Sequence, residues 1–149
     1  MKAILQRVSY ASVEVDNNLI NEISTGFLVL LGIEVNDSVE DARMFAKKTS
    51  NLRIFNDKNG KMNLSIKDVN GEILVISNFT LCADSCNGNR PSFSNAAKSN
   101  FAEELYELYC NLLSSDVRCI KKGKFGADMK VNIINDGPVT IILDTKELK

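Results

Sequence analysis

Histidine is absent from the 149 residues of this chain. The absence excludes a Ser-His-Asp or Cys-His catalytic triad, and it removes the side chain that most often serves as a general base or as a metal ligand. Any catalysis must therefore use hydroxyl groups, backbone amides, lysines, carboxylates or groups that the substrate itself brings.

Long apolar runs are also missing. None approaches the roughly 20 residues of a membrane-spanning helix, and the segment from Met1 to Arg7 lacks the apolar stretch of a signal peptide. We therefore expect a cytoplasmic protein with no membrane partner and with reduced thiols. Because the cysteines include no C-x-x-C pair, the sequence predicts neither a zinc site nor any other cofactor. The four cysteines are Cys82, Cys86, Cys110 and Cys119.

The composition is that of an ordinary soluble globular protein, with 44% hydrophobic and 25% charged residues. A chain of this length is expected to form one domain over residues 1–149, and it is long enough to bury roughly 70% of its unfolded surface. The net charge of −1 argues against a protein that coats nucleic acid, because such binding needs many lysine and arginine contacts to phosphate. Binding to one end of an RNA is still compatible with this charge.

Alternating and β-branched segments predict a chain rich in strands. One run, Gly26 to Ile33, is apolar on both faces and should lie in the centre of the sheet. The dipeptide Asn70-Gly71 predicts a tight hairpin. The predicted strands are Lys2–Val15, Leu19–Ile23, Gly26–Ile33, Arg53–Asn56, Ser65–Val69, Glu72–Leu81, Val117–Lys121, Met129–Ile134 and Val139–Leu143.

Two helices are predicted among these strands. The first begins at Asp37, with Glu40 completing a capping box, and the second begins at Ser94 or Asn95. Mostly short connections between strands favour antiparallel pairing. The sequence therefore predicts a largely antiparallel α/β fold, either a layered β/β/α sandwich or a partly closed barrel, with the two main helices on one face.

A polar corner stands between the last two predicted strands, at Asn135-Asp136-Gly137-Pro138-Val139-Thr140. Glycine permits backbone angles closed to other residues, proline cannot donate to a sheet ladder, and an X-Pro bond is the only one for which the cis form is cheap. The segment is either an ordinary turn or a functional corner.

Other polar side chains interrupt the apolar pattern at Ser77, Asn78 and Thr80, and Arg90 follows in a polar loop. Together with the corner they are candidates to line one pocket. The alternative for the two hydroxyl groups is that neighbouring backbone satisfies them. A basic turn carries Lys121, Lys122 and Lys124, which either face solvent or contact phosphate.

The chain resembles the D-aminoacyl-tRNA deacylase family through several motifs that occur in one order from Met1 to about Asp144. The motifs are Gln6-Arg7-Val8, Asn51-Leu52-Arg53-Ile54-Phe55, Gly60-Lys61-Met62-Asn63, Ser77-Asn78-Phe79-Thr80-Leu81, Arg90-Pro91-Ser92-Phe93, Gly123-Lys124-Phe125-Gly126-Ala127-Asp128-Met129 and the corner itself. The resemblance implies a homodimer that hydrolyses the ester between a D-amino acid, or glycine mischarged on tRNA-Ala, and the 3′-terminal adenosine of tRNA.

The resemblance also implies roles for individual residues. Gly137 and Pro138, joined by a cis bond, would enter the partner's pocket as a chiral filter, and Arg7 would brace their carbonyl groups. The filter's carbonyl groups would meet the substrate's α-amino group and leave an L side chain no room. The implied catalytic residues are Ser77, Phe79 and Thr80, which would line the pocket floor with the backbone N–H groups of Phe79 and Thr80 facing the ester carbonyl. Asn78 and Met129 are further substrate-binding residues. With an RNA substrate, the candidates for tRNA contacts are the basic residues Arg90, Lys121, Lys122 and Lys124.

One residue departs from the family pattern, since Asn78 stands where glutamine is usual. Asparagine keeps the amide but is one methylene shorter, so a contact to the substrate shifts or is bridged by water. A sister group with a trans Gly-Pro pair edits a different mischarged tRNA and is one alternative. Asp136 and the segment Arg90-Pro91-Ser92-Phe93 favour the cis-type group.

The chemistry that the resemblance implies is compatible with a site that lacks histidine. An aminoacyl ester on a ribose is already activated, and its vicinal hydroxyl can assist attack by water, so positioning and oxyanion stabilisation suffice. Thr80 as a covalent nucleophile lacks an evident base to activate it. The contrasting hypothesis is a dimeric RNA- or nucleotide-binding module without catalysis.

Overall fold

The structure is a computed structural model that describes residues 1–148. Its strands are β1 (Lys2–Val15), β2 (Asn18–Ile23), β3 (Gly26–Gly32), β4 (Arg53–Asn56), β5 (Met62–Ser65), β6 (Glu72–Ser77), β7 (Cys119–Lys122) and β8 (Lys130–Asp144). Its helices are α1 (Val39–Asn51), α2 (Ser99–Asp116), the short α3 (Thr145–Leu148) and a 3-10 turn, η1 (Phe79–Cys82). Within residues 1–148, no helix is long and apolar enough to cross a membrane.

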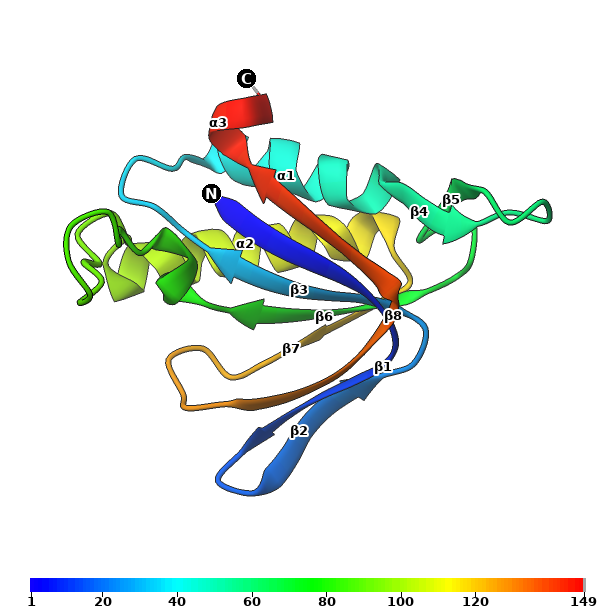
Figure 1. Cartoon of the computed structure of the whole chain (residues 1–149), viewed down its shortest axis with the longest axis horizontal. Helices are drawn as coiled ribbons and strands as arrows, with labels where there is room; N and C mark the ends of the chain where they lie inside the picture. The colour runs from blue at the N-terminus through cyan, green and yellow to red at the C-terminus, as the bar shows by residue number, and fades with distance from the viewer. Residues whose placement is uncertain (149) are drawn as a thin grey trace.

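The main sheet is organised around β1. Its strand order is β2-β1-β3-β6-β7, and β8 pairs with β1 along almost its whole length. The pairs β3–β6 and β6–β7 are parallel, whereas β1 is antiparallel to β2, β3 and β8. Figure 1 shows the lower part of the sheet curling away from the helices, so the predicted, mostly antiparallel and partly closed barrel with helices on one face is confirmed.

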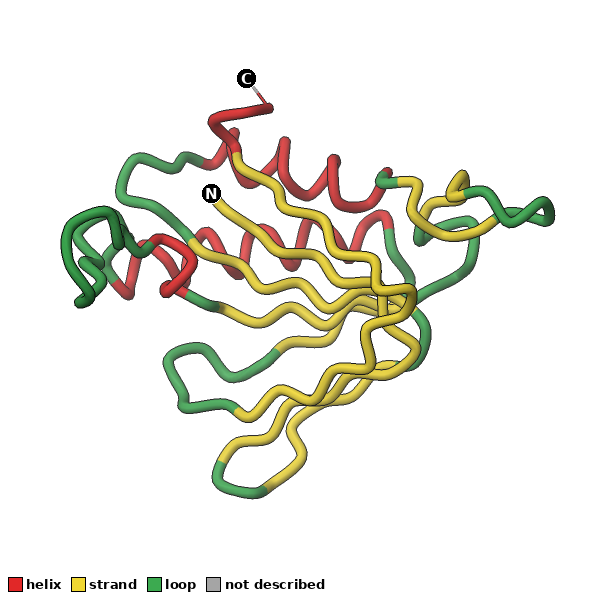
Figure 2. Tube along the Cα trace, in the orientation of Figure 1, coloured by secondary structure: helices red, strands yellow, loops and turns green. Residues whose placement is uncertain are grey.

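Hydrophobic residues bury both faces of the central strand, as the sequence predicts. On one face, α1 and α2 lie side by side against the sheet (Figure 2), and Phe27 joins a core with Phe45 and Tyr109. On the other face, Leu28 joins a second core inside the curl of the sheet, together with Leu74. Because every second residue of β3 faces a different core, this strand needs apolar residues throughout.

The first helix begins differently from the prediction. Its N-cap is Ser38, whose hydroxyl oxygen accepts from the backbone N–H of Asp41 at 3.2 Å, while the Asp41 carboxylate accepts from the backbone N–H of Ser38 at 2.9 Å. The predicted pair of Asp37 and Glu40 is therefore wrong by one residue. Asp37 instead accepts from the backbone N–H of Glu34 at 2.6 Å, which fixes the turn before the helix.

The segment between β5 and β6 also corrects the prediction. Ser65–Val69 is largely a turn and not a strand, because the Asp68 carboxylate accepts from the backbone N–H of Ser65 at 2.7 Å and closes it. Asn70 does take the positive φ of a tight turn, 52°. The next strand, however, pairs in parallel with β3, so Asn70-Gly71 is no hairpin.

The largest differences from the predicted boundaries fall at three places. The strand from Glu72 ends at Ser77 and gives way to η1, and α2 begins at Ser99, several residues after the predicted start. The two strands predicted around the Gly-Pro corner are one strand, β8, which carries the corner as a bulge. Tertiary pairing with β1 keeps the two halves of this strand in one sheet.

Candidate active site

A cavity of about 520 Å³ opens at the C-terminal ends of the parallel strands β3 and β6. Ligands of α/β sheets commonly bind beyond the carboxyl ends of parallel strands, because polar loops converge there. The wall is completed by the start of α2 and by the connection between β7 and β8. The lining residues are Leu30, Leu31, Ile33, Ile76, Ser77, Asn78, Phe79, Ala97, Ser99, Ala102, Phe125, Gly126, Ala127, Met129 and Val131.

Four of the predicted site residues line this cavity, namely Ser77, Asn78, Phe79 and Met129. Thr80 lies next to them on η1 but does not line the cavity. Its hydroxyl donates to the side-chain oxygen of Asn78, so that the amide which replaces the usual glutamine is held by its neighbour.

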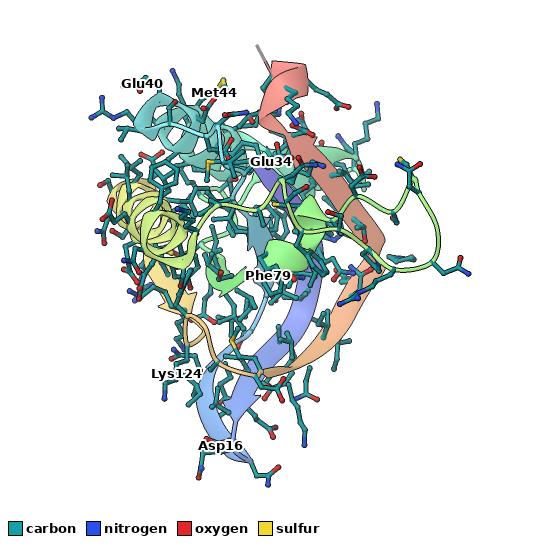
Figure 3. The ribbon with its side chains drawn as sticks, turned by 90° about the vertical axis from the view of Figure 1, so that its left-hand side faces the viewer. Asp16, Glu34, Glu40, Met44, Phe79 and Lys124 are labelled. Atoms are coloured by element: carbon teal, nitrogen blue, oxygen red, sulfur yellow. The ribbon has the colours of Figure 1, made fainter. Side chains whose placement is uncertain are left out.

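Phe79 stands at the rim of the cavity. Its side chain is 57% exposed, and its ring packs edge to face with Phe93 at a centroid distance of 5.1 Å. Figure 3 shows Phe79 near the middle of this face of the molecule. Phe93 is also exposed, so the two rings form one contiguous apolar surface, and this rim is a candidate contact surface.

The floor of the cavity is apolar, and the sequence analysis missed it. Leu30, Ile76 and Val131 reach it from the second core. In the sequence these residues look like ordinary core residues. They line a cavity only because the paired strands β3 and β6 end there. Ile76 alone offers a signal, because it directly precedes the polar residues at the end of β6.

Backbone donors lie at the same edge of the cavity. The N–H of Asn78 donates to the carbonyl oxygen of Leu31 at 2.8 Å, and η1 starts immediately afterwards. The first N–H groups of a helical turn have no acceptor within that turn. The N–H groups of Phe79 and Thr80 therefore belong to the class of donors that an oxyanion requires.

The Gly-Pro corner is a wide bulge of β8. Gln6 pairs with Thr140 and Val8 pairs with Asn135, so the segment 136–139 lies opposite Arg7 alone. The Gly137–Pro138 bond is cis, the isomer that the resemblance implies. Gly137 has a φ of 123°, and a Cβ atom there would lie 2.9 Å from the backbone nitrogen of Val139. Only glycine fits this position without displacing its surroundings.

Arg7 is buried beneath the corner, with 7% of its surface exposed. Its Nε lies 3.3 Å from both the carbonyl oxygen and the Oδ2 atom of Asp136. Its Nη1 donates to the carbonyl oxygen of Ile54 in β4 at 2.8 Å. The brace expected of Arg7 thus reaches the residue before Gly137, and the same guanidinium group ties the corner to β4.

Asn135 is a second support of the corner, and the sequence analysis gave it no separate role. Its Nδ2 donates to the carbonyl oxygens of Arg7 and Val139, at 2.9 and 3.0 Å, and its Oδ1 accepts from the Thr140 hydroxyl at 3.3 Å. These contacts join the two ends of the bulge to β1. Asparagine beside a Gly-Pro pair was the available signal, because its amide commonly bonds to nearby backbone.

The corner and the cavity do not meet within the described chain. No residue of the bulge lines the cavity, and both Gly137 and Pro138 are exposed. In Figure 1 the sharp bend of β8 lies at the opposite end of the sheet from the arrowhead of β6. One chain alone therefore does not assemble all of the predicted site residues.

The predicted phosphate contacts have different surroundings. Nζ of Lys121 donates to the carbonyl oxygen of Glu22 at 2.6 Å, and Nζ of Lys122 contacts the Glu107 carboxylate at 2.7 Å, which raises the pKa of Lys122. Lys124, next to Phe125 of the cavity wall, is exposed (Figure 3), as is Arg90 in the loop after η1.

The thiols offer no activated nucleophile. Burial raises the pKa of Cys82 and of Cys119, and it raises the pKa of Cys110 to about 12. Hydrogen bonding to the Asp84 carboxylate raises the pKa of Cys86. A raised pKa leaves a thiol protonated at neutral pH, and none of the four cysteines lines the cavity.

Known proteins resemble this chain over the segments that form both the cavity and the corner. A family model described as D-Tyr-tRNA(Tyr) deacylase matches residues 4–144, which include the cavity residues and the corner. A D-aminoacyl-tRNA deacylase of Fusobacterium nucleatum subsp. nucleatum is 52% identical over 147 residues, covering 99% of this chain and 97% of the relative. A protein of the same name from Dictyoglomus turgidum is 52% identical over 149 residues, covering 100% of this chain and 96% of the relative.

Solved structures share the fold. One, described as "c-Myc DNA Unwinding Element Binding Protein", is 44% identical with a TM-score of 0.92, and the match covers 97% of this chain and 98% of that one. Another, described as a "probable eukaryotic D-amino acid tRNA deacylase", has a TM-score of 0.81 at 14% identity, over 95% of this chain and 97% of that one. With the family model matched from β1 to the end of β8, the chain belongs to the D-Tyr-tRNA(Tyr) deacylase family.

Proposed function

We propose that this protein hydrolyses the ester bond of D-aminoacyl-tRNA and releases the D-amino acid and the tRNA. The observation that carries the proposal is that the family match covers both the cavity with Ser77 to Phe79 and the corner at Gly137 and Pro138. A deacylase is a hydrolase, so the family itself is one of enzymes. The substrate of this chain is the part that we propose.

The proposed reaction needs no side-chain base. Water attacks the ester carbonyl with help from the vicinal ribose hydroxyl, and the backbone N–H groups of Phe79 and Thr80 stabilise the oxyanion. Ser77, Asn78 and Met129 position the terminal adenosine and its ester. The Thr80 hydroxyl is not the nucleophile, because it donates to the amide oxygen of Asn78, which is not a base.

The proposed assembly is a homodimer in which each corner enters the partner's cavity. The separation of corner and cavity within one chain supports it, as do exposed apolar side chains on β8, where Ile134 is 57% and Ile142 is 73% exposed. Large apolar side chains exposed along one strand are candidates for burial against a partner. A two-fold axis that places one corner in the partner's cavity necessarily places the second corner in the first cavity.

Discrimination between D and L substrates follows from the proposed geometry. Carbonyl groups at the corner, held through Arg7 and Asn135, accept from the α-ammonium group of the substrate. With that group fixed, an L side chain points into the protein and a D side chain points out. Glycine has no side chain to exclude, so glycyl-tRNA mischarged on tRNA-Ala is also a substrate.

Hydrolysis of matched aminoacyl-tRNAs tests the proposal. The protein should cleave D-tyrosyl-tRNA and glycyl-tRNA and refuse L-tyrosyl-tRNA, and light scattering should give twice the chain mass of 16.5 kDa. Refusal of D-tyrosyl-tRNA with cleavage of another mischarged tRNA would favour the sister group with the trans Gly-Pro pair. A stable and active monomer would contradict the shared site.

A second candidate function is nucleic-acid binding without catalysis. The description of the 44% identical structure as a DNA-unwinding-element-binding protein favours it. The two functions differ in one measurement, the loss of the ester from D-aminoacyl-tRNA under single-turnover conditions. Binding of tRNA without ester loss would support the second candidate and overturn the first.

A further inference from the structure

Positive charge is concentrated in two parts of this nearly neutral chain, residues 47–68 and the segment around the basic turn at residues 118–130, and the first of these carries no predicted role. We define the basic lobe as residues 47–68, which comprise the end of α1, the β4–β5 hairpin and the turn after β5. The lobe contains two carboxylates, Asp57 and Asp68. Against them stand six basic side chains, namely Lys47, Lys48, Arg53, Lys58, Lys61 and Lys67. Since the whole chain has 18 basic and 19 acidic residues, everything outside the lobe is net negative.

The two carboxylates of the lobe accept hydrogen bonds from the lobe's own backbone. Asp57 accepts from the backbone N–H groups of Asn59 and Lys61, at 2.8 and 3.0 Å. Asp68 accepts from the hydroxyl and the backbone N–H of Ser65, both at 2.7 Å. Neither carboxylate forms an ion pair with a lysine of the lobe, although Lys67 and Arg53 help to lower the pKa of Asp68.

Within residues 1–148, no basic side chain of the lobe takes part in an ion pair. Elsewhere Lys2, Lys122 and Lys146 pair with glutamates. Lys58 and Lys61 are both exposed on the turn of the β4–β5 hairpin. Unneutralised cations on a projecting hairpin fit a polyanion with regularly spaced phosphates.

The lobe is fixed to the Gly-Pro corner. The buried guanidinium group of Arg7 contacts Asp136 through Nε, and through Nη1 it donates to the carbonyl oxygen of Ile54 in β4. Its Nη1 also lies 3.5 Å from the Oδ1 atom of Asn56, the last residue of β4. Figure 1 shows the hairpin projecting from the end of the molecule at which β8 bends. The position of the corner in an assembly therefore also fixes the position of the basic lobe.

We propose that the basic lobe binds backbone phosphates of the tRNA whose ester occupies the partner subunit's cavity. The proposal rests on the proposed function, in which the corner enters that cavity. A corner inserted there brings its own lobe to the cavity mouth, where the acceptor arm of the tRNA leaves the site. Each tRNA is thus held by the cavity of one subunit and by the lobe of the other.

Neutralising two lysines at the tip of the lobe tests this inference. The variant Lys58→Gln with Lys61→Gln removes the charge, leaves an unbranched polar side chain one atom shorter, and keeps the backbone contacts of Asp57. For D-tyrosyl-tRNA, kcat/KM should fall about tenfold or more at physiological salt, through KM, and the salt dependence should weaken by about one unit of slope per lost phosphate contact. For D-tyrosyl-adenosine, which has no phosphate, kcat/KM should stay at the wild-type value.

The matched control is Arg118→Gln with Lys130→Gln, which makes the same change in net charge outside the lobe. It should leave both substrates unaffected. Unchanged kinetics of the lobe variant on D-tyrosyl-tRNA would overturn the inference, and so would an equal loss on both substrates, since that indicates a disturbed cavity.

Failure of the proposed function is distinguishable from failure of this inference. If the wild-type protein hydrolyses neither substrate, the proposed function fails, and fluorescence anisotropy with uncharged tRNA then tests the lobe alone. Weaker tRNA binding by the lobe variant than by the control variant would uphold phosphate binding. Equal binding by the two variants would overturn it.

Discussion

Gly137 is the residue at which the corner tolerates least change. A Cβ atom there would lie 2.9 Å from the backbone nitrogen of Val139 and 3.1 Å from Nη2 of Arg7, at a φ of 123°. Gly137→Ala should therefore displace the bulge and reduce kcat/KM for D-tyrosyl-tRNA by about 10²-fold, since small misplacements in a positioned site cost that much. Single-turnover hydrolysis measures the effect.

The control for this substitution is Gly88→Ala in the exposed loop after η1. Gly88 also has a positive φ, 75°, but a Cβ atom there would meet nothing within 4 Å. Activity of Gly88→Ala close to wild type, beside the loss in Gly137→Ala, would assign the effect to crowding at the corner. Full activity of Gly137→Ala would show that the corner is only a turn.

At the scale of single residues, sequence reasoning predicted the polar lining of the cavity. Ser77 and Asn78 interrupt an apolar pattern, and residues that break core rules tend to be functional, whereas Phe79 was predicted through the family resemblance. The apolar floor was not predictable, because Leu30 and Ile76 obey the same rules as any core residue. Whether an apolar side chain contacts a neighbour or lines a cavity depends on where two paired strands end. Strand pairing is a property of the tertiary structure and cannot be read from the local sequence.

Among the helices and strands, the start of α1 offers a direct test of local stability. Ser38→Ala removes the capping hydroxyl and should lower the free energy of unfolding by about 1 kcal/mol. Glu40→Ala, at the residue that sequence reasoning chose for the capping box, should change stability by no more than about 0.5 kcal/mol. Urea denaturation compares the two variants, and an equal loss in both would contradict the assignment of Ser38 as the cap.

The turn between β5 and β6 should make stability depend on pH. The hydroxyl and backbone N–H of Ser65 hold the pKa of Asp68 below its ordinary value. A carboxylate whose folded pKa is lowered stabilises the fold above its unfolded pKa, and the contribution is lost as the pH falls through the folded pKa. Asp68→Asn should therefore be less stable than wild type at pH 7 and equally stable once Asp68 is protonated.

Urea midpoints for wild type and Asp68→Asn, measured across the acid range, check this expectation. Ser65→Ala is the companion variant, because removing its hydroxyl should raise the pKa of Asp68 in a titration followed by NMR. A stability difference that stays constant down to full protonation would contradict a role for the charge.

The Asn70-Gly71 prediction was right about the turn and wrong about the strand pairing. Asn70 does adopt the positive φ that the dipeptide favours. The strand that follows leaves β5 and joins β3 in parallel, because its residues, such as Leu74 and Val75, supply both cores. Local signals thus located the turn, whereas burial over the whole sheet decided the pairing partner.

At the scale of the whole molecule, the curled sheet explains why the corner and the cavity lie apart. The cavity requires the ends of β3 and β6, whereas the corner requires a long β8 wrapped along β1 and anchored to β4 through Arg7. The overall architecture was predictable from strand patterns and helix placement. The distance between the corner and the cavity was not, because it depends on how far the sheet turns.

Mixed dimers decide whether the corner acts across the subunit boundary. One chain carries Ala102→Trp, which fills the cavity from α2 but leaves the corner intact, and the other carries Gly137→Ala, which leaves the cavity open. Each homodimer should be strongly impaired, since neither combines an open cavity with an intact corner. If the corner acts across the boundary, the mixed dimer regains one working site, in which the open cavity receives the intact corner. The reverse pairing, wild type with a chain bearing both substitutions, should then be inactive. Activity in this reverse pairing, measured on D-tyrosyl-tRNA with two affinity tags selecting the mixed dimer, would place corner and cavity in the same chain.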